Sequence, residues 1–436
     1  MTTPTDKLQP SLTPTLLWGL GVGYVISGLY FGWNLGLQQG GTLGMAVATG
    51  LVVVLYICFS MSYAELACAI PQAGGVFDYA SRALGSRWGF VAGIAQIVEF
   101  VFAPPAIALA IGAHINLFFP SISTNSTAIF VYFIFTFLNI RGVKLAATFE
   151  LIITILAVCG LLLFVGLSVS QFEIKNLTTN ALPNGWSGAW AAIPFAIWFF
   201  LGIEGLANAA EESINPQQDL TRGFGLSMAT LVVLCVLTAV CAVGVAGWEA
   251  IVFKADGTIT DSPLPLALAH VSVLWQRAVI FFGLCGLVAS FHGLLMAGGR
   301  ASYEMGRSRN LPKWLGNISP KYQTPANALI ANMLIGIVAL LTNSTADIIV
   351  LSVLGALTLY VFGSLSVIIL RKTEPHTPRP FSVPAFPIVP IIALVLSVVA
   401  LGAVVYFNQT LTTWYVFVLV GAVFFRTLKQ YFSTQI

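Results

Sequence analysis

Three glutamates, Glu99, Glu150 and Glu204, lie well inside long apolar runs, and no Lys or Arg is expected at comparable depth. Inserting an acidic residue at the centre of a membrane helix costs about 2.5–3.5 kcal/mol on translocon scales, so such residues usually face a cavity or a partner. Three buried acids without a basic counterpart favour a cationic ligand, protonation or a metal cation. These residues are the first candidates for a functional site.

Glu99 is the best candidate for binding the ammonium group of an amine. It lies about 18 Å along a helix from Arg87, near the middle of a hydrocarbon core about 30 Å thick. The alternative is a neutral glutamic acid that is hydrogen-bonded to a neighbouring backbone group. Glu150 lies only about 9 Å from Lys144, so we expect local pairing or a cytoplasmic gate there.

A small amine would also need aromatic walls and carbonyl oxygens. An aromatic face attracts an ammonium by about 0.5–2 kcal/mol, and the C-terminal ends of interrupted helices expose carbonyls of negative dipole character. Candidate aromatic residues near two interrupted spans are Tyr24, Tyr30, Trp198, Phe199 and Phe200. Most aromatic residues of such a chain face lipid or the core, so Trp198 is the strongest of them.

The composition predicts that these residues sit in membrane helices. Hydrophobic residues make up 58% of the 436 residues and charged residues 8%, against roughly 25% charged in soluble domains. The apolar runs do not alternate, which excludes a barrel, and helices are the remaining form that satisfies the backbone in lipid. We expect twelve spans, near 15–38, 43–69, 88–116, 125–140, 145–169, 188–211, 224–249, 265–298, 325–343, 346–370, 386–407 and 411–430.

The basic residues predict the orientation. With twelve spans, both termini lie on one side, and that side receives all of the 19 Lys and Arg residues except Lys175, Lys254 and Arg277. The positive-inside rule then makes both termini cytoplasmic. We expect a multi-pass protein of the inner (plasma) membrane, a single domain surrounded by the lipid bilayer.

Two spans contain signals of helix interruption. The first reads GLGVGYVISGLYFGWNLGL, with six glycines, and the sixth reads IPFAIWFFLGIEGLANAAEE, with Pro194, Gly202 and Gly205. Broken helices at matching places in two halves are the best sequence pointer to a transporter's binding site. They predict two five-span repeats of opposite orientation, about 15–169 and 188–370, followed by trailing helices at about 386–430. Close helix packing is the simpler explanation for the glycines.

Three long segments resemble the amino acid–polyamine–organocation permeases: SYAELACAIPQAGGVFDYASRALG, LGIEGLANAAEESINPQQD and GRASYEMGRSRNLPKWLGNISPKYQTPANAL. The resemblance implies a LeuT-type five-plus-five inverted repeat with discontinuous helices 1 and 6, two C-terminal helices, and alternating access. Within the superfamily, QIVEFVFAPPAIALAIGAHI and the sixth span look most like bacterial ethanolamine permeases.

The resemblance assigns roles residue by residue. The family's break in span 1 falls on Val25, Ile26, Ser27, Gly28, Leu29 and Tyr30, and its Gly-Phe-Glu motif falls on Gly202, Ile203 and Glu204. An aromatic residue that covers the substrate in relatives corresponds to Trp198. Together with the acids and aromatic residues chosen above, the candidate substrate-binding residues are Tyr24, Val25, Ile26, Ser27, Gly28, Glu99, Trp198, Phe199 and Gly202. The candidate gate or ion-coupling residues are Glu204, Glu150, Ser290 and His292, of which Ser290 and His292 lie where relatives line the ion or gate region.

Two departures from the family pattern bear on the substrate and the coupling ion. Ile26 replaces the first glycine of the break, and its branched side chain crowds the backbone N–H groups that would hold a carboxylate. Ala157 stands where some proton-coupled relatives carry a lysine, so that route for a proton is missing. Sodium symport, proton symport through Glu204, exchange and facilitated diffusion all remain open.

The sequence gives no support to an enzyme, a cofactor, a metal site or a nucleic-acid partner. It lacks His-Glu-x-x-His, Gly-x-Ser-x-Gly and P-loop motifs, its four histidines are scattered, and its six cysteines lie in apolar runs. We expect a secondary transporter that imports a small organic amine, ethanolamine first, with H⁺ or Na⁺ as a coupled ion, as a monomer or weak oligomer. The alternative is a permease for neutral or cationic amino acids.

Overall fold

The computed structural model describes residues 10–269, 271–342 and 344–433, without the side chains of residues 143–147 and 429–433. Throughout these residues the regular elements are helices, joined by turns and two isolated β-bridges. A helix satisfies the hydrogen bonds of its own backbone, and hydrocarbon offers the backbone no other partners. The expected all-α class is confirmed.

The described helices follow one another along the chain, with no β-sheet between them. The first group is α1 (Pro14–Tyr30), α2 (Asn34–Ala69), α3 (Val76–Leu84), α4 (Ser86–Phe118), α5 (Thr124–Arg141), α6 (Val143–Ser168), η2 (Val169–Gln171) and α7 (Ile174–Thr178). The middle group is α8 (Gly185–Ala191), α9 (Ile193–Trp198), η3 (Ile203–Glu212), α10 (Pro216–Ala246), α11 (Trp248–Val252) and α12 (Pro263–Ala267). The last group is α13 (Val273–Arg307), η4 (Lys313–Gly316), α14 (Ala326–Leu340), α15 (Thr345–Thr373), α16 (Ile388–Phe407) and α17 (Gln409–Ser433).

Nine helical segments of the described chain are long and apolar enough to cross a membrane. Helices α1, α5 and α14 occupy three further expected spans, and α1 and α14 are shorter, with 17 and 15 residues. The count of twelve spans therefore stays a prediction, while a multi-span membrane protein is established.

Some expected spans have different bounds. Helix α2 begins at Asn34 and α10 at Pro216, well before the starts expected at 43 and 224. The span expected at 265–298 begins only at Val273, after the short helix α12, and continues to Arg307. The side-chain amide of Gln276 donates hydrogen bonds to the carbonyls of Leu268 and Val271, both at 2.9 Å. These bonds stabilise a turn before α13, and an apolar run alone does not reveal such a turn.

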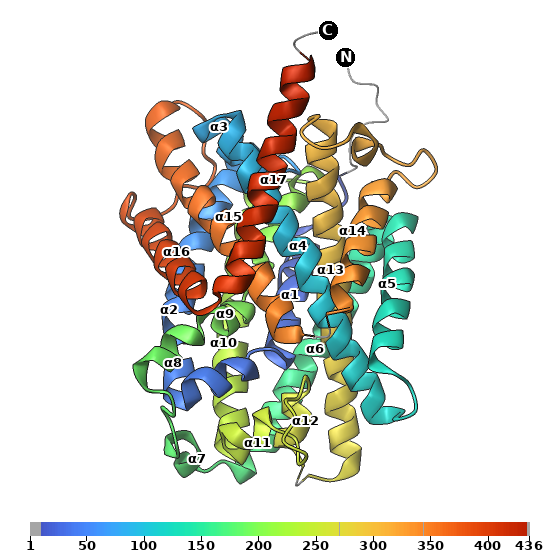
Figure 1. Cartoon of the computed structure of the whole chain (residues 1–436), viewed down its shortest axis with the longest axis vertical. Helices are drawn as coiled ribbons and strands as arrows, with labels where there is room; N and C mark the ends of the chain where they lie inside the picture. Colours follow the sequence, from blue (N-terminus) through green and yellow to red (C-terminus); the bar gives the residue numbers. More distant parts are fainter. Residues whose placement is uncertain (1–9, 270, 343, 434–436) are drawn as a thin grey trace.

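The bundle has two distinct ends (Figure 1). Helix α3 and the C-terminal end of α17 lie at one end, and α7, α11 and α12 lie at the opposite end. This arrangement matches the expected division of the connecting segments between two sides of a membrane. Helix α1 is buried along almost its whole length and contacts α6, α10 and α13, while α4 packs against α13 and α15.

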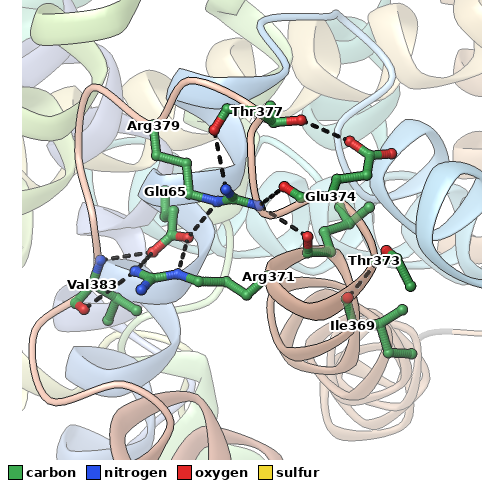
Figure 2. Close-up of polar contacts among 9 residues, drawn as sticks. Glu65, Ile369, Arg371, Thr373, Glu374, Thr377, Arg379 and Val383 are labelled. Atoms are coloured by element: carbon green, nitrogen blue, oxygen red, sulfur yellow. Dashed lines mark hydrogen bonds and ion pairs between the residues drawn. The ribbon is translucent and has the colours of Figure 1, made fainter.

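A charged cluster joins helices at the end that carries α3 (Figure 2). Glu65 of α2 accepts two hydrogen bonds from the Arg371 guanidinium, at 2.8 and 2.6 Å, and one from the backbone N–H of Val383 at 2.7 Å. Arg379 approaches the same carboxylate to 3.3 Å. The cluster fixes α2 to α15 and to the segment that follows α15.

Candidate functional site

Two helix interruptions supply irregular backbone within the bundle. Helix α1 ends at Tyr30, Phe31–Trp33 form a turn, and α2 continues from Asn34. Helix α9 ends at Trp198, and η3 begins at Ile203. Gly32 and Gly202 have φ angles of 85° and 104°, which an L-side chain rarely adopts. Glycine at these two positions lets each chain turn.

The first interruption lies later than expected. Val25, Ile26, Ser27 and Gly28 are helical, and the break follows at Phe31–Trp33. Residues 25 and 26 are β-branched and buried within regular helix, whereas Gly32 provides the positive φ angle that the turn requires. The break therefore sits at the glycine that can adopt this angle, and the resemblance to the family placed it a few residues too early.

The two interruptions meet. A Cβ atom on Gly28 would collide with the carbonyl oxygen of Trp198, and one on Gly32 would lie 2.5 Å from its Nε1. The ring of Trp198 also makes an edge contact with Phe31, with centroids 5.5 Å apart, and Phe199 stacks on Trp33 at 5.4 Å. We call this contact region, residues 28–33 and 198–202, the junction. The Nε1 of Trp198 has no hydrogen-bond partner among the described residues.

Ser290 of α13 enters the hydrogen-bond ladder of α1. Its hydroxyl donates to the carbonyl of Gly23 at 2.6 Å and accepts from the N–H of Ser27 at 2.9 Å. In an uninterrupted helix that N–H would bond directly to that carbonyl. A side chain inserted in this way opens a helix locally. The last turns of α1 before the junction are thus held by α13.

Glu99 is a buried acid without a hydrogen-bonded partner. Its side chain is 0% exposed, and neither carboxylate oxygen has a partner among the described residues. The backbone hydrogen bond of the alternative interpretation is therefore absent among the described residues. An unpartnered carboxyl in such an environment is costly.

Helix α15 relates Glu99 to the junction. Ser352 donates to the carbonyl of Glu99 at 2.9 Å, and a Cβ on Gly355 would lie 2.7 Å from the N atom of Glu99. One turn before Ser352, the side chain of Ile349 packs 3.0 Å from the Cβ position of Gly32. Three residues of helix span about 4.5 Å, so the Glu99 backbone and the junction lie at neighbouring levels of α15.

Glu204 links the second interruption to two tyrosines. Its carboxylate accepts from the N–H of Gly202 at 3.1 Å and from the hydroxyl of Tyr360 at 3.2 Å. That hydroxyl lies 2.7 Å from the hydroxyl of Tyr56, which donates to the carbonyl of Ile197 at 3.3 Å. The chain of bonds bridges the gap between α9 and η3 and ties it to α2 and α15.

Glu150 and His292 form a buried pair. Nδ1 of His292 lies 2.8 Å from Oε2 of Glu150, and the two side chains are 1% and 0% exposed. For Glu150 we expected local pairing with Lys144 or a cytoplasmic gate; the Lys144 side chain lies outside the described part of the chain, so that pairing stays a prediction. The carboxylate bonds to a histidine 142 residues away in sequence, and its Oε1 lies beside the backbone of α1 at Gly23.

A buried arginine escaped sequence analysis. Arg300 of α13 is 2% exposed and pairs with Glu212 at 2.6 Å, and its Nη1 donates to the Tyr24 hydroxyl at 3.4 Å. We expected Arg300 on the cytoplasmic side, just after the span that ends at residue 298. The apolar run that ends at residue 298 hid the continuation of α13, and small residues on both sides of Arg300 were the available signal.

The structure brings together some of the expected substrate-binding residues. Gly28, Trp198, Phe199 and Gly202 belong to the junction, and the carbonyl of Tyr24 lies 3.3 Å from the Cβ position of Gly202. Val25 and Ile26 are buried one turn earlier in α1, and Ser27 is engaged with Ser290. Two cavities, of about 500 and 340 Å³, follow the α2–α10 seam with apolar linings, and the second one reaches Trp33.

The comparisons with known proteins agree with this architecture. The family described as "Amino acid permease" matches residues 15–425. An uncharacterized transporter of Rhizobium meliloti is 27% identical over 98% of this chain and 93% of its own length. A branched-chain amino acid permease of Bacillus subtilis is 26% identical over 93% of this chain and 90% of its own. A methylthioribose transporter of the same bacterium is 26% identical over 86% and 85%, respectively.

The matched region contains both interruptions, the buried acids and the helices that hold them. Such a match over nearly the whole chain identifies the molecule as a transporter and not as an enzyme. The chain belongs to the amino acid permease family, within the amino acid–polyamine–organocation superfamily.

Proposed function

We propose that this transporter imports a small organic amine, ethanolamine first among candidates, by alternating access. The observation that carries the proposal is the carboxylate of Glu99, which is fully buried and has no hydrogen-bond partner among the described residues. An ammonium ion would supply both the missing charge and the missing donors. In this proposal Glu99 binds the ammonium, and Trp198 provides an aromatic wall beside it.

The state of the backbone N–H groups favours an amine over a carboxylate. The N–H of Ser27 bonds to Ser290, that of Phe31 to the Ser27 carbonyl, and that of Gly32 to the side chain of Asn34. At the second interruption, the N–H of Gly202 bonds to Glu204. Donors that are already engaged cannot hold a substrate carboxylate without first giving up these bonds. An amine alcohol has no carboxylate, so it can bind without breaking these bonds.

An amino acid is the second candidate because of the relatives. Their printed names include a branched-chain amino acid permease and a cationic amino acid transporter of Arabidopsis thaliana. In that case the α-amino group would meet Glu99, and the carboxylate would displace one of the bonds at the junction. The amine and the amino acid share the ammonium, so the carboxylate is what distinguishes them.

The proposal includes an arrangement in the membrane. Residues 15–169 and 188–370 form two repeats of opposite orientation, and the helices at 386–430 follow them. Both termini face the cytoplasm in the inner membrane, as the distribution of Lys and Arg supports. Glu204, with Tyr360 and Tyr56, forms a gate that changes when the gap between α9 and η3 opens.

A thermal-shift assay on purified protein tests the substrate. Ethanolamine, alanine, arginine and leucine are added separately, at equal concentration and constant pH. Because a ligand stabilises the state that it binds, we expect the largest rise in melting temperature with ethanolamine. An equal or larger rise with any of the amino acids would transfer the proposal to that class of substrate.

A further inference from the structure

We infer that Glu150 and His292 together bind one proton whose downhill entry drives uptake, so that the protein is a proton symporter. This inference rests on the proposed transport function and names its coupling ion. It assigns the proton to a pair of side chains on α6 and α13, away from Glu99. It also offers a route that does not need the lysine replaced by Ala157.

The pair is closed off from solvent on every side that the structure describes. Helix α1 contributes Gly23 and the ring of Tyr24, α5 contributes Phe135 and the amide of Asn139, and α6 contributes Phe149 and Thr154. The amide of Asn139 donates to the backbone carbonyl of His292 and not to its ring. Oε1 of Glu150 has no hydrogen-bond partner among the described residues.

Among the side chains that the structure describes, the nearest charges do not compensate the pair. On the side of α1, the Tyr24 hydroxyl contacts Arg300, and Arg300 is already neutralised by Glu212 at 2.6 Å. Arg300 lies eight residues after His292 on α13, which is about 12 Å along the axis. The charge of Glu150 and His292 is therefore set by their own protons.

One proton changes the net charge of the pair between −1 and 0. With carboxylate and neutral imidazole the charge is −1. With one proton added, on the imidazole or on the carboxyl, it is 0. A net charge in a water-free interior is strongly disfavoured, whereas a neutral hydrogen-bonded pair is tolerated. The closed arrangement seen here therefore belongs to the protonated pair, and the unprotonated pair requires access to water.

The same turn of α1 connects the protonation state of the pair to the junction. Oε1 of Glu150 contacts Gly23, and Ser290, two residues before His292, binds both Gly23 and Ser27. The next residue after Ser27 is Gly28, which packs on Trp198. Water that reaches an unprotonated pair must separate α1 from α6 and α13, and this movement shifts the junction as well.

The transport cycle follows from these two contacts. The pair takes a proton when it is open to the outside, becomes neutral, and can then be enclosed together with the bound ammonium. It releases the proton when it opens to the inside. One proton and one substrate cation enter per cycle, because the empty protein returns without a proton, its unprotonated pair solvated by water.

Two assays in proteoliposomes separate the coupling from the substrate. Counterflow of labelled ethanolamine at equal pH measures exchange across the membrane without a proton gradient. Net accumulation is then measured with the outside two pH units more acidic, with equal potassium on both sides and valinomycin present. One proton per substrate allows up to about a hundredfold accumulation. Leakage of neutral ethanolamine collects it on the acidic outside and works against this result.

The decisive variant is E150Q, with H114N as its matched control. Glutamine resembles the protonated carboxyl, so we expect E150Q to retain counterflow and to lose accumulation above equilibration. His114 is equally buried, but its ring bonds only to the carbonyl of Ala110 at 2.9 Å. H114N should accumulate like the wild type. If E150Q shows no counterflow, H292N decides the matter in the same two assays.

The outcomes are distinct for the two proposals. Counterflow by the wild type without any response to the pH gradient, or full accumulation by E150Q, would overturn the coupling while leaving the transport function intact. Absence of counterflow by the wild type for ethanolamine and for amino acids would overturn the proposed function itself. Accumulation driven by a sodium gradient at equal pH would also count against the proton.

Discussion

The hydroxyl of Ser290 occupies the place of a backbone hydrogen bond in α1. It satisfies a buried carbonyl and a buried N–H on another helix at once, so its loss affects two backbone groups. Ser397, by contrast, is equally buried, and its hydroxyl donates only to Ala393, one turn earlier in its own helix, at 2.7 Å. The two serines differ in what depends on them.

This difference predicts the result of two substitutions. S290A should lower the melting temperature clearly, because unsatisfied buried groups cost about 1–3 kcal/mol each, whereas S397A should lower it much less. Thermal unfolding in detergent is the measurement. Equal stability of the two variants would mean that, without the hydroxyl, the N–H of Ser27 bonds directly to the carbonyl of Gly23.

Sequence analysis identified the buried acids but not their partners. Charge within an apolar run marks Glu99, Glu150 and Glu204 without any structural knowledge. Their surroundings depend on residues that are distant in sequence, since His292 is 142 residues from Glu150 and Tyr360 is 156 residues from Glu204. A local sequence pattern cannot identify partners at such separations.

At the scale of elements, the contact between α1 and the end of α9 depends on a missing side chain. Gly28 leaves no room for a Cβ beside the carbonyl of Trp198, while Gly50 of α2 has nothing within 4 Å. Sequence patterns located both interrupted helices from their Gly and Pro residues. They misplaced the first break by a few residues, because the choice among six glycines depends on which one packs and which one turns.

The two glycines form a matched test. G28A should force α1 away from α9, at a cost of about 1–3 kcal/mol for overpacking, and should abolish counterflow. G50A should leave counterflow intact and the stability unchanged or slightly raised, since alanine is the better helix former. Thermal unfolding and counterflow of both variants provide the check. A fully active G28A would show that the junction is not required for transport.

Helix α3 predicts a dependence of stability on pH. Burial, aided by the Glu304 carboxylate, raises the pKa of Asp78 from 3.8 to about 7, although its Oδ2 accepts a bond from the N–H of Gly74 at 3.0 Å. Between these two pKa values the folded state holds a proton that the unfolded state has lost. Stability therefore decreases as the pH rises from about 4 to about 7.

The substitution D78N should remove this contribution. Asparagine can still accept the bond from Gly74, and it has no charge to bury. We expect the melting temperature of D78N to vary less between pH 4 and pH 7 than that of the wild type, with the largest gain at pH 7. Parallel curves for the two proteins would contradict the role of Asp78.

At the scale of the whole molecule, composition and hydropathy predicted the class. Long apolar runs with few charges allow only a multi-span helical protein, and the helices lie largely where the runs are, although α2 and α10 begin earlier and α12 precedes α13. The internal order of the bundle came from resemblance and from contacts, since apolar periodicity does not specify which helices are neighbours. In this bundle α1, α4, α13 and α15 surround the two interruptions, and Glu99 is held on α4 beside α15.

The central claim is that Glu99 is the counterion of the substrate, and direct binding tests it. The affinity of purified protein for labelled ethanolamine is measured for the wild type, for E99Q, and for E249Q as a control at an exposed position of helix α11. Loss of a buried charged partner costs about 2–5 kcal/mol, which is roughly a thirtyfold loss of affinity or more. We predict that loss for E99Q alone, together with an unchanged or higher melting temperature without ligand. Wild-type affinity in a folded E99Q would contradict the account.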